Sequence, residues 1–515
     1  LDDPGLDIAA GEEFLQEVFQ ILLEEGVRKS MDVTQKVCDW KKPQELRELL
    51  DLELRSDGEG RERLLQRCRD VLRLSVRTGH PRFCNQLFSG LDHHALAGRF
   101  LTETLNTSPY TYEVAPVLVL MEEQVLAKLR ELVGWSSGDG IFAPAGGSMS
   151  NMLAMNVARF RRFPESRSRG NWDLPRLGLF ASRESHYSIL KGAALLGIGT
   201  DNVHLVRTDE RGKMIPEELE KEIQRVKAEV RRVCTPPCPP CPPNSPVPPQ
   251  YPQRPSQCPQ SSLNVRVSSS KSPKPLQCCP KFCFFPPTRA DSVTWNPHKL
   301  LMVGLQCSAF LLRDSSVGAP HPEFLPRGCL PGPLINLAAS CSSQGLLQRC
   351  HGVGASYLFQ RDKFYDVSLD TGDKSPQCGR RADGLKLWIL WKAVGTRGLG
   401  WRVERAFAAT RYLLEQMKRR EGFRLVMEPE FLNLCFWFIP PSLRGQDSSP
   451  EFWDKLGKVA PAIKEKMIRR GSMMVGYQPQ GSRVNFFRQV IINPAVTRQD
   501  LDFFLDEIQE LGWDL

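Results

Sequence analysis

Apolar and polar residues alternate with helical spacing along the first part of the chain. The stretches EEFLQEVFQILLEEGV (12–27) and PQELRELLDLEL (43–54) place apolar residues three and four positions apart. This spacing predicts an N-terminal helical segment over residues 1–75. Further on, APVLVLMEEQVLAKLRELVG (115–134) predicts a long amphipathic helix, which Gly134 can close because glycine readily takes the left-handed conformation.

After residue 76 the pattern changes to short apolar runs separated by amphipathic stretches. LGLFAS (177–182) and NVHLVRT (202–208) are typical of strands, whereas SILKGAALLGI (188–198) and PEELEKEIQRVKAEV (216–230) are typical of helices. ADSVTWNPHKLLMVGLQCSAFLL (290–312) predicts a strand, a turn and a second strand. The alternation predicts a large α/β domain over residues 76–384, with a mostly parallel central sheet covered by helices.

The last part of the chain predicts a small α/β domain of its own, over residues 385–515. KLWILWKAV (386–394) and AFAATRYLLEQMKRREG (406–422) are helical in pattern, and FRLVMEP (423–429) and NLCFWFIP (433–440) are typical of strands. A further helix, further strands and a final helix, LDFFLDEIQELG (501–512), complete it.

Two stretches interrupt these patterns. Residues 230–288 hold 17 of the 40 prolines and show no periodicity, and residues 316–345 are also rich in Pro and Gly. Proline cannot donate to a strand ladder, so neither stretch predicts a strand. We considered a zinc site, since Cys234, Cys238 and Cys241 have suggestive spacing, and a polyproline ligand for an SH3-like module. We favour the interpretation that both stretches are sequence foreign to the natural protein, from a retained intron or a gene-model error, and we expect both to be disordered.

Much of the net positive charge and many of the cysteines lie in the first of these two stretches. The formal net charge is +9, but Val230 to Ala290 holds eight Lys/Arg and no Asp or Glu, so the rest of the chain carries 9 − 8 = +1. This argues against a nucleic-acid-binding protein. No apolar run is long enough to span a membrane, and the acidic N-terminus does not resemble a secretory signal. Seven of the sixteen cysteines lie between Cys234 and Cys283; the others are scattered singly, which favours reduced thiols in the cytoplasm.

The strongest candidate for chemistry is N-P-H-K at Asn296–Lys299. A lysine that follows a strand among apolar residues can be desolvated and partly neutral, so its amine can condense with an aldehyde. An arbitrary lysine is far more often an exposed turn residue. The other motifs in the chain favour the first interpretation.

Three further motifs accompany Lys299. Gly146-Gly147-Ser148 stands before a predicted helix, where backbone N–H groups and a hydroxyl can bind a phosphate, although such turns are commonly only turns. His186 in S-H-Y-S follows a predicted strand and could stack on a flat heterocycle; a core or surface histidine is the alternative. Arg488 stands alone in the apolar strand NFFRQVIINP, where a substrate carboxylate could be its partner.

Together these motifs resemble the group II pyridoxal-5′-phosphate-dependent decarboxylases, in the branch that acts on glutamate and cysteine sulfinate. HPRFCNQLFSGLD, NTSPYTYEVAPV, DGIFAPAGGSMSN, DSVTWNPHKL, ASYLFQRDKFYDVSLDTGDK and NFFRQV carry the resemblance, which covers roughly residues 10–229, 289–315 and 346–515. Phe88, Ser89 and Tyr110 resemble the cysteine sulfinate enzymes. Glutamate decarboxylases usually carry a smaller residue where Phe88 stands and Phe where Tyr110 stands.

The resemblance implies a fold-type I homodimer with active sites at the subunit interface, and a role for each site residue. Lys299 would hold pyridoxal 5′-phosphate covalently, His186 would stack on its ring, and Gly147, Ser148 and His298 would hold its phosphate. Arg488 would pair with the substrate α-carboxylate, while Gln86, Phe88 and Tyr110 would contact the rest of the substrate. Tyr357 would protonate the substrate Cα after CO₂ leaves. No metal, nucleic acid or membrane is implied.

The implied activity is that of a carboxy-lyase acting on small acidic amino acids. Cysteine sulfinate, converted to hypotaurine, would be the chief substrate, with cysteate and aspartate as secondary ones. Preference for aspartate or glutamate is an alternative.

One departure from the family pattern opens another alternative. The family carries, after the helix that would end near Glu229, two strands and an Asp in D-A-A-W-G-G that pairs with the pyridinium nitrogen. Here no acidic residue stands between Val230 and Ala290. The chain could therefore be a catalytically impaired or dead splice or gene-model variant that lacks this Asp.

Overall fold

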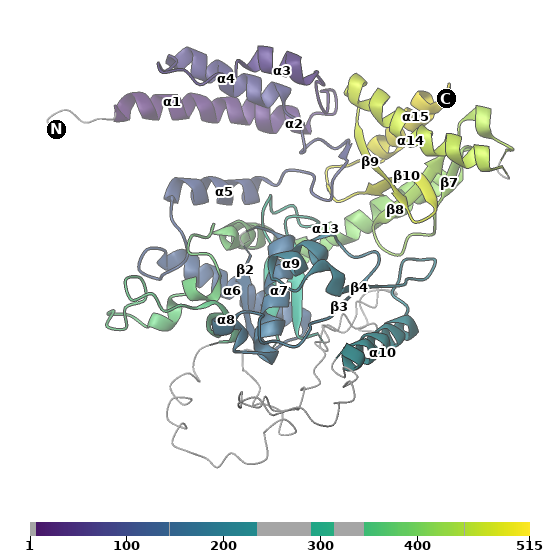
Figure 1. Ribbon diagram of the computed structural model, residues 1–515. Helices are drawn as coiled ribbons and strands as arrows, with labels where there is room; N and C mark the ends of the chain where they lie inside the picture. Colours follow the sequence, from purple (N-terminus) through teal and green to yellow (C-terminus); the bar gives the residue numbers. More distant parts are fainter. Residues whose placement is uncertain (1–6, 144, 234–289, 314–344, 447–448) are drawn as a thin grey trace, which may run out of the picture. The chain divides into compact units, whose positions relative to one another are not determined.

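The computed structural model describes residues 7–143, 145–233, 290–313, 345–446 and 449–515 (Figure 1). The chain divides into two compact units. Unit 1 comprises Leu1–Leu101, Pro297–Leu305 and Ile389–Leu515, and unit 2 comprises Thr102–Asn296 and Gln306–Trp388. This grouping differs from the three domains expected from the sequence, 1–75, 76–384 and 385–515, whose boundaries stay a prediction.

The N-terminal part of unit 1 is helical, which confirms the prediction from its apolar spacing. Helix α1 (Ile8–Ile21) continues through the π-helical η1 (Leu22–Arg28) into α2 (Lys29–Met31), followed by α3 (Pro43–Leu50) and α4 (Arg61–Leu74). Asp7 caps α1 by accepting the Ala10 N–H at 3.0 Å. The chain then enters β1 (Phe83–Cys84) and α5 (His93–Leu105), whose last turns belong to unit 2.

A five-stranded sheet forms the core of unit 1. Its order is β1-β9-β10-β8-β7, in which β1 runs parallel to β9 and the other neighbours pair antiparallel. The later strands are β7 (Phe423–Leu425), β8 (Asn433–Phe438), β9 (Met474–Gln480) and β10 (Arg483–Val490). The helices of this part are α13 (Asp383–Lys418), which begins in unit 2 and breaks at Gly395, the 3₁₀ turn η7 (Pro441–Leu443), α14 (Pro450–Arg470) and α15 (Arg498–Gly512).

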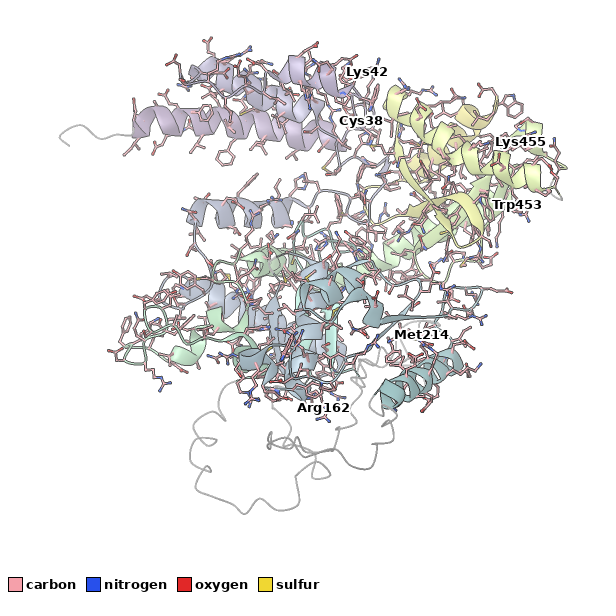
Figure 2. The ribbon with its side chains drawn as sticks, viewed as in Figure 1. Cys38, Lys42, Arg162, Met214, Trp453 and Lys455 are labelled. Carbon is pink, nitrogen blue, oxygen red and sulfur yellow. The ribbon has the colours of Figure 1, made fainter. Side chains whose placement is uncertain are left out.

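Aromatic side chains fill the space between this sheet and its helices. Phe436 and Phe487 stack at 5.4 Å between ring centroids, and both are fully buried. Trp453 of α14, labelled in Figure 2, meets Trp437 edge-on at 5.5 Å. Each such burial contributes about 2–3 kcal/mol, so this core holds β10 and the residues on it firmly in register.

Unit 2 contains two small sheets. The first has the order β2-β6-β5, with β2 (Asp139–Phe142), β6 (Ala309–Leu312) and β5 (Ser292–Trp295); the second pairs β3 (Leu179–Ser182) with β4 (Val203–Val206). The α-helices of this unit are α6 (Pro116–Val133), α7 (Gly147–Arg162), α8 (Ser166–Arg169), α9 (Ser188–Leu195), α10 (Pro216–Val233) and α12 (Leu346–His351). Its 3₁₀ turns are η2 (Thr200–Asn202), η5 (Val367–Leu369) and η6 (Gly372–Lys374). Gly134 closes α6 with φ +88°, as its position in the sequence predicts.

The α/β character is confirmed, but the strand directions differ in part from the expected parallel sheet. β3 and β4 pair in parallel, whereas β6 runs antiparallel to both β2 and β5. The reason lies in the connection from β5 to β6, residues 296–308, which contains no helix. Without a crossover element the chain can only return in the opposite direction. β2 and β5 therefore point the same way on either side of β6.

Several sequence predictions fall largely or wholly outside the described residues. The Pro- and Cys-rich stretch 230–288 and the second stretch 316–345 belong almost entirely to this part, together with the cysteines considered for zinc. Within the described ranges the cysteines are free thiols: Cys38, Cys68, Cys84, Cys307, Cys350, Cys378 and Cys435. None of the helices in those ranges is both long and apolar enough to cross a membrane.

Candidate active site

Lys299 stands in a tight turn directly after β5 and Asn296. The Met302 N–H donates to the Lys299 carbonyl at 3.1 Å, and the Val303 N–H donates to the Pro297 carbonyl at 3.3 Å. Met302 has φ +56°, a left-handed conformation that costs free energy in any residue with a side chain. Strain of this kind persists only where the surrounding packing fixes it, so the turn that carries Lys299 is held in one shape.

The Lys299 amine is half-buried and lies near a second cation. Burial lowers the pKa of Lys299 below its ordinary value of 10.5, and the positive charge of Arg488 lowers it further. Arg488 lies on β10, where its Nε donates to Asn433 Oδ1 at 3.0 Å. Among the residues that the structure describes, no carboxylate lies within ion-pair distance of Arg488. The pair therefore offers an amine with a lowered pKa beside a cation that can take an anionic ligand.

The segment that carries Phe88 packs against the Lys299 turn within unit 1. Gly90 has φ +82°, and a Cβ there would lie 2.3 Å from Met302 Sδ. A residue with a side chain would be strained at this φ and would displace Met302, so glycine suits this position. Beside it lies a cavity of about 300 Å³, whose lining includes Phe88, Ser89 and the buried His298. The structure thus brings Phe88 and His298 to one cavity next to Met302.

Gln86 follows β1 at the edge of the five-stranded sheet and is exposed. The Asn85 carbonyl lies 3.3 Å from the position of a Cβ on Gly476, and Gly476 pairs across β9 and β10 with Arg488. Gln86 therefore follows a residue that lies against β9, and β9 is the strand that pairs with β10 at Arg488.

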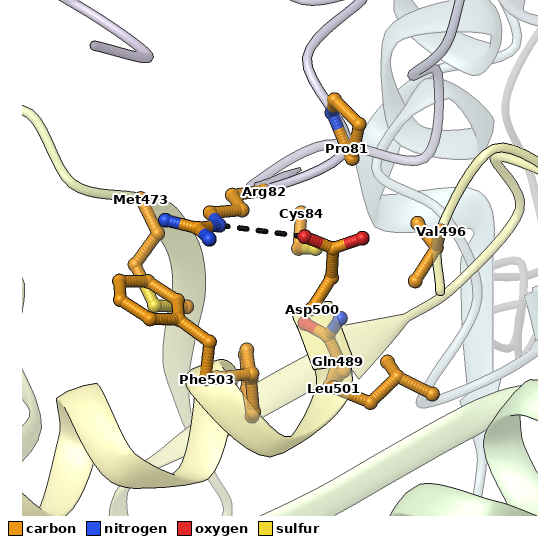
Figure 3. Close-up of a pocket in the computed structure, with 10 residues that line it drawn as sticks. Pro81, Arg82, Cys84, Met473, Gln489, Val496, Asp500, Leu501 and Phe503 are labelled. Atoms are coloured by element: carbon orange, nitrogen blue, oxygen red, sulfur yellow. Dashed lines mark ion pairs between the residues drawn. The ribbon is translucent and has the colours of Figure 1, made fainter. Parts of the chain in front are cut away.

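A second, much smaller cavity lies between β1, β10 and α15 (Figure 3). Its lining includes Cys84, Gln489 and the ion pair of Arg82 Nε with Asp500 at 3.5 Å. Its volume is about 10 Å³, which holds roughly one water molecule and no substrate.

The start of α7 in unit 2 has the features of a phosphate site. Gly146 precedes the helix with φ +74°, and a Cβ on Gly147 would lie 2.8 Å from both polar atoms of the Asn296 amide. The helix is 16 residues long, and its first turn presents backbone N–H groups beside the Ser148 hydroxyl. This donor set and the absence of a side chain at Gly147 fit a phosphate dianion.

His186 is held at the start of α9, against α7. Its Nδ1 accepts the Ser188 N–H at 3.1 Å and lies 2.9 Å from Ser188 Oγ, which accepts from Asn151 Nδ2 at 2.9 Å. Because Nδ1 accepts a backbone N–H, the neutral ring carries its proton on Nε2. A Cβ on Gly192 would lie 2.9 Å from Met155 Sδ, so the two helices approach closely. Unit 2 thus brings His186 to the helix whose start carries Gly147 and Ser148.

The segments that carry Tyr110 and Tyr357 both contact η6 of unit 2. Tyr357 is 78% exposed on the segment after α12, and Tyr110 is half-buried. Gly372 of η6 stands between the two segments, since a Cβ there would lie 2.9 Å from Phe359 Cζ and 2.9 Å from the Tyr110 carbonyl.

The predicted site residues therefore form two groups. Unit 1 holds Gln86, Phe88, His298, Lys299 and Arg488, and unit 2 holds Tyr110, Gly147, Ser148, His186 and Tyr357. The sequence patterns did not single out Asn151 or Asn433, whose amides fix Ser188 and Arg488. Their contacts join residues 37 and 55 positions apart, and no local spacing marks them.

Comparison with known proteins finds decarboxylases that are similar to this chain over nearly its full length. A family model described as "Pyridoxal-dependent decarboxylase conserved domain" matches residues 43–235 and 338–439. The chain is 54% identical to cysteine sulfinic acid decarboxylase of Rattus norvegicus over 510 residues, which are 99% of this chain and 98% of the relative. It is 51% identical to acidic amino acid decarboxylase GADL1 of Bos taurus over 516 residues, 100% of this chain and 94% of the relative.

Solved structures agree with the fold. The crystal structure of mouse CSAD shares 48% identity and a TM-score of 0.81, covering 99% of this chain and 100% of that chain. A tryptophan decarboxylase of Catharanthus roseus at 17% identity, with a TM-score of 0.70, covers 99% of both chains and shares the fold alone. These likenesses confirm the predicted fold class, the fold-type I architecture of pyridoxal-phosphate enzymes. Lys299 lies between the two segments that the family model matches.

The depressed pKa of Lys299 predicts how its amine reacts. In the chain without cofactor, more Lys299 is neutral below pH 10.5 than for an ordinary lysine, so an amine-reactive reagent should modify it faster. We expect Arg488→Met to raise the pKa of Lys299 and slow its modification at pH 8, because a neighbouring positive charge is removed. Arg488→Lys keeps the charge and should react like the wild type. Peptide mass spectrometry across a pH series measures the rate at which Lys299 is modified. The same midpoint of the rate–pH curve for wild type and Arg488→Met would contradict the prediction.

Proposed function

The chain belongs to the pyridoxal-dependent decarboxylase family, and from this premise we propose that it decarboxylates cysteine sulfinate to hypotaurine. It is a pyridoxal-phosphate-dependent carboxy-lyase, like the relatives that cover nearly its full length. Cysteate and aspartate are the secondary substrates that we propose. The observation that carries the proposal is the half-buried Lys299 amine beside Arg488, because both the cofactor aldehyde and a substrate carboxylate have a partner there.

Pyridoxal phosphate, when bound, supplies an electron sink for the bond that breaks at the substrate Cα. Lys299 would bind the cofactor through its amine, and its depressed pKa supports this because only a neutral amine attacks an aldehyde. The N–H groups at the start of α7, with Ser148 and His298, would hold the phosphate. His186 would lie against the cofactor ring, with a proton fixed on Nε2 by its bonds to Ser188.

The substrate would be bound through its charges. Arg488 would pair with the α-carboxylate, and a fixed carboxylate keeps the scissile bond in the orientation that decarboxylation requires. Gln86 would contact the substrate from the edge of the sheet, while Phe88 and Tyr110 would limit the length of its side chain. Tyr357 would donate its phenolic proton to Cα once CO₂ has left. Its 78% exposure supports this role, since the proton must be replaced from solvent after each cycle.

We further propose a homodimer in the cytoplasm. Ile8, Leu15, Phe19 and Leu23 are exposed along α1 and η1, at spacings that place them on one helical face. An exposed apolar stripe of this kind is typical of a surface that another chain covers. A second copy is the occupant we propose, because the family resemblance implies active sites shared between two chains. The free thiols in the described ranges support a reducing compartment.

A second candidate is a chain of the same family that binds the cofactor but is impaired in catalysis. The observation that favours it is in the sequence: no Asp or Glu stands between Val230 and Ala290, where the family places the carboxylate that pairs with the pyridinium nitrogen. Without that partner the ring accepts electrons less readily.

Turnover by the complete chain separates these two candidates. Purified with pyridoxal phosphate, it should release CO₂ from cysteine sulfinate, and Lys299→Ala should lower this rate by several orders of magnitude. Lys191→Ala, which removes an amine from the outside of α9, is the matched control and should leave the rate unchanged. Cofactor binding without CO₂ release would overturn the first candidate and support the second.

Substrate length should respond to the two residues assigned to specificity. We expect Phe88→Ala combined with Tyr110→Phe to lower the ratio of kcat/KM for cysteine sulfinate over glutamate about tenfold, because glutamate needs room for a longer side chain. Steady-state kinetics with both substrates measure the ratio. A wild type that already prefers glutamate would contradict the assignment.

The oligomer should respond to the apolar stripe. Light scattering should give twice the chain mass of 58.2 kDa, and Phe19→Lys together with Leu23→Lys should shift the protein toward the single chain. Glu12→Lys with Glu24→Lys changes charge without removing apolar surface and serves as the control. A single-chain mass for the wild type would contradict the dimer.

A further inference from the structure

The turn Asp370–Lys374, with the sequence DTGDK, contacts both ends of the segment that carries Tyr357. We call residues 353–365 the Tyr357 segment and residues 370–374 the DTGDK turn. The turn itself is fixed by buried groups of unit 2. Arg380 Nη2 donates to Thr371 Oγ1 at 3.1 Å while Arg380 Nη1 pairs with Glu122 at 2.8 Å, and Lys374 Nζ pairs with Asp139 of β2 at 3.0 Å. A support of this kind cannot shift without breaking ion pairs in the interior.

Asp373 holds the first end of the Tyr357 segment. Its Oδ1 accepts the Val353 N–H at 3.1 Å, and its Oδ2 accepts the Gly354 N–H at 3.0 Å. Charge-assisted bonds from one carboxylate to two successive N–H groups are stronger than bonds between neutral groups. Gly354 has φ +66°, so the chain bends here in a conformation that glycine takes readily.

Asp370 holds the other end. Lys363 Nζ donates to Asp370 Oδ2 at 2.9 Å and to the Leu358 carbonyl at 2.8 Å, and the Tyr365 hydroxyl donates to Asp370 Oδ1 at 3.0 Å. The side chains of Lys363 and Asp370 are only 8% and 3% exposed. Breaking a buried pair leaves an uncompensated charge, so this end is held as firmly as the first.

The same turn holds the segment that carries Tyr110. The Gly372 N–H donates to the Tyr110 carbonyl at 2.7 Å, Thr371 Oγ1 donates to the Pro109 carbonyl at 3.1 Å, and the Tyr112 N–H donates to Asp370 Oδ1 at 2.9 Å. Asp370 therefore bonds to both segments at once. Gly372 leaves space for Phe359 on one side and Tyr110 on the other, as described above.

We propose that the DTGDK turn is a shared anchor that positions Tyr357 relative to Tyr110, with Asp370 and Asp373 as its positioning residues. The inference rests on the proposed function, in which Tyr357 delivers a proton to the substrate and Tyr110 contacts it. Between the two held ends Ser356 and Tyr357 are exposed, so the position of the Tyr357 side chain depends on the anchors on either side of it. Proton delivery needs the hydroxyl close to one atom, and a loosened end would spread its positions.

The test compares Asp373→Asn and Lys363→Met with wild type in the cofactor-loaded enzyme. Hydrogen–deuterium exchange of peptides from the Tyr357 segment should become roughly tenfold faster in each variant, since each loses a charge-assisted anchor. For cysteine sulfinate, kcat should fall about tenfold with little change in KM, because Tyr357 acts after binding. Asp366→Asn is the matched control: its carboxylate is exposed and bonds locally to Ser368, whose N–H donates to Oδ1 at 2.9 Å, so neither readout should change.

A double-mutant cycle links the anchor to the proton donor. If the anchor acts through Tyr357, Asp373→Asn should cost little additional kcat in a Tyr357→Phe background. The same tenfold loss in both backgrounds, or exchange no faster than in Asp366→Asn, would overturn the proposal. Two other outcomes would contradict the proposed function rather than the anchor. Either Tyr357→Phe would keep the wild-type kcat, or neither the wild type nor any variant would release CO₂. Exchange still tests the anchor in that case, because it needs no turnover.

Discussion

The half-buried position of the Lys299 amine, beside the cation of Arg488, is the constraint on which the proposed chemistry of unit 1 depends. Burial and a neighbouring cation both disfavour the charged form of a lysine, and both lower the pKa of Lys299. The turn that holds it is correspondingly fixed. Arg402 donates to the Leu301 carbonyl at 3.1 Å and pairs with the buried Asp92, which itself accepts the Ala95 N–H at the start of α5. With the strained Met302, these contacts keep the amine in place and bring Phe88 and His298 to one cavity.

The start of α7, where we propose that the cofactor phosphate binds, lies against the residue that follows β5. β5 ends at Trp295, and the amide of the next residue, Asn296, lies against Gly147 at the start of α7. The residues that follow Asn296 along the chain form the Lys299 turn. Along the chain, the residue that contacts the start of α7 and the residue proposed to bind the cofactor aldehyde are thus only three positions apart, Asn296 and Lys299. The bonds from Asn151 through Ser188 to His186 extend this arrangement to the residue that would lie against the ring. The DTGDK turn anchors the segments of Tyr357, the proposed proton donor, and Tyr110, a proposed substrate contact. Each of these groups is placed by ordinary hydrogen bonds and packing, and each can be removed separately.

Much of this arrangement could be predicted from the sequence, but only where it depends on local pattern. The apolar spacing of 115–134 and Gly134 predict α6 and its end, and N-P-H-K following a strand predicts the place of Lys299. The antiparallel direction of β6 was not predicted, since it depends on the absence of a crossover helix between 296 and 308. The contacts that hold the site also escaped prediction. Asp370 and Tyr112 are 258 positions apart, and nothing in DTGDK itself says which backbone groups its carboxylates accept.

The central claim is that Lys299 is the amine that carries pyridoxal phosphate. Borohydride reduction of the cofactor-loaded chain, followed by peptide mass spectrometry, tests it directly because reduction makes the link permanent at whichever lysine holds it. The account predicts a pyridoxyl group on Lys299, and its loss in Lys299→Ala. A pyridoxyl group found reproducibly on another lysine, or none on Lys299 in protein that retains the cofactor, would contradict it.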